Sequence, residues 1–88
     1  MQIKILGEGE KAIINSESVN QIFIVREING FFEEYYLVIE TETRRYNVGV
    51  YDSFKAVNRD YNRILKNEKA GKNLTELKIK KASVVNCF

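Results

Sequence analysis

Residues 35–66 constrain the fold more than any other part of the sequence, because two segments with strand periodicity lead directly into one with helix periodicity. In the first segment, Tyr35, Leu37 and Ile39 share one face of an extended chain. The second segment, Tyr46–Tyr51, alternates in the same way. This succession predicts antiparallel strands with a helix packed on them.

The helix is predicted to run from Ser53 to Ala70. Asp52 and Ser53 have side chains that cap a helix N-terminus, and Gly71 suits the left-handed position that follows a helix. Apolar residues recur at helical spacing between these limits, and they are Phe54, Val57, Tyr61, Ile64 and Leu65. We expect these side chains to form the face that packs on the sheet.

Four further segments have strand character. Gln2–Leu6 and Lys11–Ile14 flank a loop with two glycines, which is typical of a hairpin. Val19–Ile28 contains the consecutive apolar residues 22–25, which favour a central strand covered on both faces. The last strand lies within Leu74–Phe88, where apolar residues alternate with lysines.

Two turns are predicted from local chemistry. The residues 15–18 are all Asn, Ser or Glu, and Asn and Ser side chains bond to their own backbone in turns. Asn29-Gly30 is a strong hairpin signal, because both residues tolerate positive φ. Phe31 and Phe32 follow at once, so we expect an exposed aromatic turn longer than two residues.

These elements predict a single α+β domain over residues 1–88. The expected architecture is an antiparallel sheet of four to six strands, with one amphipathic helix packed on one face, in the order β-β-β-β-β-α-β. A hydrophobic content of 44% in 88 residues suffices for one modest core.

Composition argues against catalysis and against a metal site. The chain has no histidine, which is the commonest general base and metal ligand. The single cysteine, Cys87, leaves no set of soft ligands for zinc. We therefore expect no enzyme activity, no catalytic residues, no metal and no cofactor.

The expected location is the cytoplasm, without membrane association. One cysteine cannot form an internal disulfide, which fits a reducing compartment. The segment that follows Met1 alternates instead of forming a signal sequence, and no apolar run approaches the roughly 20 residues that cross a bilayer.

Charge is distributed unevenly along the chain. Residues 1–53 carry five Lys or Arg and nine acids, a net charge of 5 − 9 = −4. Residues 54–88 carry nine cations and three acids, a net charge of 9 − 3 = +6. This bipolar pattern permits head-to-tail self-association into a homo-oligomer.

The predicted helix has a basic face opposite its apolar face. Its four cations are Lys55, Arg59, Arg63 and Lys66. They lie within about 80° of one another at 100° per residue, and Asp60 is the only acid between Phe54 and Lys66. Such a stripe fits either an ordinary solvated surface or contact with a phosphate backbone or an acidic protein.

The run INSESVNQIFI, then YYLVIET, then YNVGVYDSFKAVNRDYNRIL resembles small uncharacterised proteins of low-GC Gram-positive bacteria and their phages. The resemblance covers residues 11–66, and its motifs are structural. It implies a compact sheet-plus-helix domain with no known activity.

We therefore expect a small non-catalytic interaction module that binds a protein partner through a sheet edge, the Phe31-Phe32 turn or the basic helix face. A phage or mobile-element accessory protein fits the resemblance. The alternative is a nucleic-acid-binding domain that uses the basic helix face together with Lys78, Lys80 and Lys81.

Overall fold

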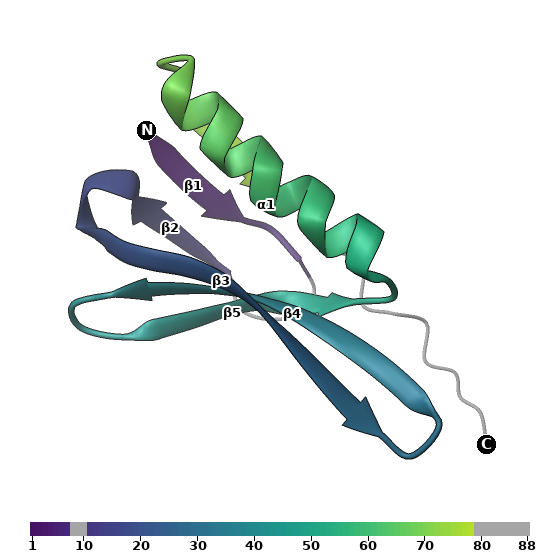
Figure 1. The fold of residues 1–88 in the computed structure, drawn as a ribbon. Helices are drawn as coiled ribbons and strands as arrows, with labels where there is room; N and C mark the ends of the chain where they lie inside the picture. Colours follow the sequence, from purple (N-terminus) through teal and green to yellow (C-terminus); the bar gives the residue numbers. More distant parts are fainter. Residues whose placement is uncertain (8–10, 79–88) are drawn as a thin grey trace.

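In the computed structural model, residues 1–7 and 11–78 are described, and they form six strands and one α-helix (Figure 1). The strands are β1 (Gln2–Ile5), β2 (Ala12–Asn15), β3 (Val19–Asn29), β4 (Phe32–Thr41), β5 (Arg45–Tyr51) and β6 (Leu74–Leu77). The helix α1 (Phe54–Lys69) lies between β5 and β6 in the chain. The α+β class is confirmed.

The strands form two sheets, so the expectation of one antiparallel sheet is wrong. The first sheet has the order β2-β1-β6 and the second sheet has the order β3-β4-β5. In the first sheet β1 runs antiparallel to β2 and parallel to β6. Parallel pairing needs a crossover connection, and here that connection includes the whole second sheet and the helix, so strands from the two ends of the described chain become neighbours.

A 3₁₀ helix (Ser16–Ser18) leads the chain from the first sheet into the second. The Asn15 side chain accepts a 3.0 Å hydrogen bond from the backbone N–H of Glu17, and the Ser18 hydroxyl donates to the Asn15 carbonyl at 2.7 Å. The predicted turn at residues 15–18 is confirmed.

The second sheet is a meander of three antiparallel strands, and β3, which was predicted to be a central strand, lies at its edge. Consecutive apolar residues in β3 resemble a doubly covered strand. The register shows a different arrangement: Ile22 and Ile24 lie opposite the buried residues Ile39 and Leu37, whereas Phe23 and Val25 lie on the other face.

The helix bounds agree closely with the prediction. Ser53 is the N-cap, and its hydroxyl oxygen accepts a 3.1 Å hydrogen bond from the backbone N–H of Ala56. Ala70 is the C-cap, and Gly71 follows it with φ 73°. Lys66 and Lys69 lie in the last turn, where cations interact favourably with the helix dipole.

The apolar face of α1 is only partly as predicted. Val57 and Ile64 are buried and Tyr61 packs at the margin of the core, but Phe54 and Leu65 are exposed. The centre of the buried side is rotated about the helix axis by roughly 60° from the centre of the predicted apolar face, in the direction of Asp60. The helix contacts both sheets, and polar side chains on that side find partners there: Asn67 donates to Thr75 Oγ1 of β6 at 2.9 Å.

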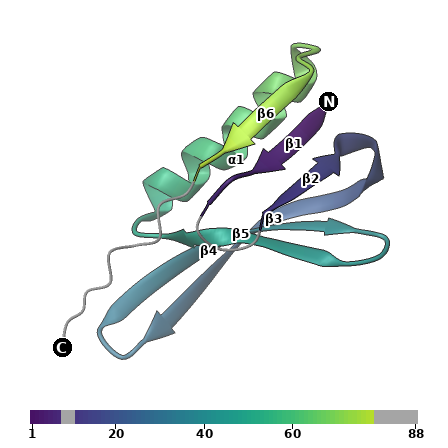
Figure 2. The same cartoon turned by 180° about the vertical axis from the view of Figure 1, so that it is seen from behind.

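The core lies between the two sheets and the helix. Its fully buried members come from every layer, and they include Ile3, Ile5, Leu37, Ile39, Val48, Val57 and Leu77. Figures 1 and 2 show α1 and β1 on the same side of the second sheet. Part of the predicted C-terminal segment Leu74–Phe88 lies outside the described residues, and this part includes Ile79, Lys80, Lys81, Val84, Val85, Cys87 and Phe88.

Candidate interaction surfaces

The β3–β4 hairpin extends beyond the rest of its sheet. Strand β3 pairs with β4 as far as Asn29 and Phe32, whereas β5 pairs with β4 only between Tyr35 and Glu40. Only β3 and β4 remain in residues 27–34, and this two-stranded segment, with Arg26 at its base, projects from the body of the molecule (Figure 1). We call this segment the arm.

The tip of the arm is apolar and exposed. Relative exposure is 103% for Phe31, 73% for Phe32 and 61% for Ile28. The loop has two residues, Gly30 and Phe31, and is shorter than predicted because β4 begins at Phe32. Gly30 has φ 62° while Phe31 has negative φ, which is the pattern of a tight hairpin turn with glycine first.

Side-chain contacts along the arm hold it in one shape. Arg26 pairs with Glu33 on the neighbouring strand, and the Tyr35 hydroxyl donates to the same carboxylate at 2.8 Å. On the opposite face, Asn29 Nδ2 donates to Glu34 Oε1 at 2.9 Å. A two-stranded hairpin is marginal by itself, so these contacts matter for presenting the tip.

The charge around the tip is acidic. The arm carries Glu27, Glu33 and Glu34 against Arg26, a net charge of 1 − 3 = −2. The hydrogen bond from Arg26, followed by that from Tyr35, holds the pKa of Glu33 below its ordinary value. The arm therefore stays negative at neutral pH.

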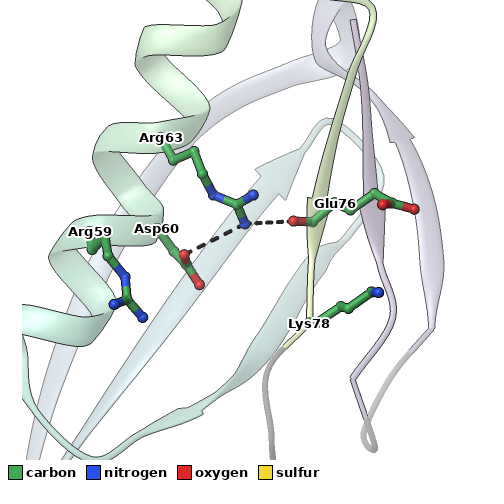
Figure 3. Close-up of a pocket in the computed structure, with 5 residues that line it drawn as sticks. All are labelled: Arg59, Asp60, Arg63, Glu76 and Lys78. Atoms are coloured by element: carbon green, nitrogen blue, oxygen red, sulfur yellow. Dashed lines mark hydrogen bonds and ion pairs between the residues drawn. The ribbon is translucent and has the colours of Figure 1, made fainter.

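The basic helix face is smaller in the structure than in the sequence. Lys55, Arg59 and Lys66 are exposed. Arg63 is exposed as well, but it turns toward β6, where its guanidinium donates to the Glu76 carbonyl oxygen at 2.5 Å and lies 3.6 Å from the Asp60 carboxylate (Figure 3). Arg63 therefore joins the helix to the first sheet.

A shallow hollow of about 460 Å³ lies between α1 and the end of β6. Its lining residues are Arg59, Asp60, Arg63, Glu76 and Lys78 (Figure 3). Asp60 is already engaged, because it accepts a 2.9 Å hydrogen bond from the Tyr51 hydroxyl and pairs with Arg63. The hollow therefore contains a structural polar network, and we assign it no chemistry.

Ile28 is a member of the exposed tip that the sequence pattern does not predict. It ends a run with strand character, and such residues are commonly buried. The signal that places it outside is its register opposite Glu33, beyond the last residue of β4 that pairs with β5.

Comparison with family models, with curated proteins and with solved structures finds no match to this chain. In residues 1–7 and 11–78, no helix has the length and apolar character needed to cross a membrane. Within the same residues, no three His, Cys, Asp or Glu side chains are grouped as metal ligands. The exposed surfaces are therefore the features of this protein that point to a function.

Proposed function

We propose that this protein is a non-catalytic interaction module that binds a protein partner through the tip of the arm. The observation that carries the proposal is the exposure of Ile28, Phe31 and Phe32 at the end of a projecting hairpin. Aromatic side chains that enter a pocket on a partner commonly provide most of the binding energy of an interface.

The arm is built for such contact. Its tip is held by a glycine turn and by cross-strand side-chain pairs, so little conformational entropy is lost on binding. Burial of each large apolar side chain contributes on the order of 1.5–3 kcal/mol before the costs of association. The acidic flanks of the arm favour a partner whose pocket has a basic rim.

The proposed setting is the cytoplasm of a bacterial cell, as a phage or mobile-element accessory protein. This setting is supported only by the resemblance of residues 11–66 and by the single cysteine, which fits a reducing compartment.

The test is quantitative affinity capture from the native host with matched variants. The double variant Phe31→Ser and Phe32→Ser removes the tip, and Ile13→Ser removes an exposed apolar side chain on β2, far from the arm. We expect one partner to be retained by the wild type and by Ile13→Ser and lost from the tip variant. Equal retention by all three proteins would refute the role of the tip.

The second candidate function is nucleic-acid binding by α1. It is favoured by the exposure of Lys55, Arg59 and Lys66 on one side of the helix, although Arg63 is engaged elsewhere. Binding of DNA or RNA whose affinity falls steeply with salt would support it. The affinity should also fall more in Arg59→Glu than in the control variant Lys11→Glu. No binding at low salt would remove it.

A further inference from the structure

Strand β3 presents a long open edge. It has eleven residues, and within residues 1–7 and 11–78 it pairs only with β4, so one of its two edges has no neighbouring strand. Its register with β4 is regular from Gln21 to Asn29. None of its residues is buried, whereas Leu37 and Ile39 of the adjoining β4 are fully buried.

Hairpin geometry identifies the backbone groups that point outward from this edge. A two-residue hairpin loop is flanked by a hydrogen-bonded pair, and here that pair is Asn29 and Phe32. In antiparallel strands such pairs recur at every second residue. The intervening residues of β3 direct both N–H and C=O away from β4, and they are Ile22, Ile24, Arg26 and Ile28. In the described chain, no loop backbone bonds to these groups.

The other edge strands of the two sheets are obstructed. Strands β2 and β6 have only four residues each, and in β6 the Glu76 carbonyl already accepts from Arg63. Strand β5 contains a bulge, because Gly49 and Asn47 lie opposite consecutive residues of β4 and leave Val48 without an opposite residue. Short strands and bulges are common means of preventing an edge from pairing with another chain.

Strand β3 lacks these obstructions. It is the longest strand of its sheet, and its register shifts only between Val19 and Gln21, at its beginning. It contains no lysine and no proline, which also protect edges. The side chain of Arg26 is drawn toward β4 by its ion pair with Glu33. The edge is therefore a template for a further strand.

We propose that an extended segment of the partner protein adds to this edge as a fourth strand of the second sheet. This inference rests on the proposed function, because Ile28 belongs to both the apolar tip and the open edge. A partner that binds the tip is thereby placed beside β3. In strand addition, main-chain hydrogen bonds provide affinity and alternate side chains provide specificity.

The side chains of β3 define the segment that fits. The run Ile22–Val25 supplies apolar side chains to both faces of the sheet, so the added strand should be apolar on both faces as well. Nearer the tip, Glu27 lies directly opposite Glu34, and a lysine or arginine of the segment would offset this pairing of like charges. The partner is therefore expected to offer an extended, proline-free apolar segment with a basic residue at one end.

The first test is amide hydrogen exchange in the free protein. The amides of Ile22 and Ile24 should exchange quickly, because their N–H groups point outward, whereas those of Phe23 and Val25 should be protected by hydrogen bonds to β4. Protection of all four amides would show that the edge is already filled in the free chain, and this result would overturn the proposal.

The second test uses a library of random peptides of about ten residues, the length of a long strand. Selection on the full chain should enrich proline-free apolar segments with a lysine or arginine at one end. A selected peptide should also slow exchange at Ile22 and Ile24 when it binds. Failure to enrich such segments, or binding that leaves both amides unprotected, would overturn the proposal.

Two variants of one residue separate the backbone contribution from that of the side chain. Arg26→Pro and Arg26→Ala both lose the ion pair with Glu33, but only proline removes the outward N–H, and an edge strand tolerates proline at such a position. We expect the selected peptide to bind Arg26→Pro roughly tenfold more weakly than Arg26→Ala, with matching circular dichroism spectra for the two variants. Equal affinity for two folded variants would overturn the proposal.

The tip variant distinguishes failure of this inference from failure of the proposed function. If the partner captured from the host is lost from Phe31→Ser with Phe32→Ser but is retained equally by Arg26→Pro and Arg26→Ala, the tip binds it and strand addition is wrong. If it is lost from Arg26→Pro and retained by Arg26→Ala and by the tip variant, strand addition is supported and the role of the tip is refuted.

Discussion

The hydroxyl of Tyr51, the last residue of β5, donates a 2.9 Å hydrogen bond to the carboxylate of Asp60 on α1. Asp60 also pairs with Arg63, whose guanidinium donates to a β6 carbonyl. One buried aromatic residue is thereby connected through the helix to the first sheet, and this network links the three layers.

The pH dependence of stability should report on Tyr51. Burial, followed by the hydrogen bond to Asp60, raises the pKa of Tyr51 above its ordinary value of about 10. The folded state therefore retains a proton that the unfolded state loses, so this contribution is complete below about pH 10 and declines as pH rises further.

Urea unfolding of the wild type and of Tyr51→Phe between about pH 8 and about pH 11 would measure this effect. The free energy of unfolding should fall more steeply with pH in the wild type, because phenylalanine cannot ionise. Tyr35 and Tyr36 also have raised pKa values, so the variant should retain part of the decline. Identical curves for the two proteins would contradict the assignment.

Neighbouring helix residues should respond differently to truncation. Ile64 is buried and Leu65 is exposed. We expect Ile64→Ala to reduce the free energy of unfolding by about 2–5 kcal/mol and Leu65→Ala by less than about 1 kcal/mol. Chemical denaturation of both variants measures the difference, and similar losses would show that the helix faces are misassigned.

The N-terminal cap should contribute measurably to the stability of α1. Ser53→Ala removes the acceptor for the backbone N–H of Ala56, and we expect a loss of about 1 kcal/mol. Ser53→Asp should preserve most of the stability because its carboxylate accepts the same hydrogen bond. Thermal melts of the two variants would test this, and an equal loss from both would argue against capping.

The arm should depend on the backbone conformation of Gly30. A Cβ at this position would meet nothing within 4 Å, so any effect of Gly30→Ala comes from its φ of 62°. We expect a local cost of about 1–2 kcal/mol, seen as faster amide hydrogen exchange in the arm. Phe31→Ala is the matched control and should leave exchange nearly unchanged, since its side chain is fully exposed.

The basic helix face illustrates the limit of periodicity as a guide. Lys55, Arg59, Arg63 and Lys66 share a stripe in the sequence, but Arg63 is bound to β6. This hydrogen bond joins residues 63 and 76, which belong to different elements, so the periodicity of the helix cannot predict it. Similarly, Phe54 fits the apolar spacing but lies outside the core, with its ring edge-on to Tyr35 at 5.9 Å.

The sequence by itself determined the α+β class, the helix bounds, the positions of the strands in the described chain and the turn at residues 15–18. These features depend on contacts within a few residues, such as the Ser53 cap and the alternation along β4. Only the tertiary structure decided that the strands divide into two sheets, that Gln2 pairs beside Leu74, and that β3 lies at an edge. Those outcomes depend on the burial of side chains far apart in the chain, where several arrangements satisfy the same alternation of apolar and polar residues.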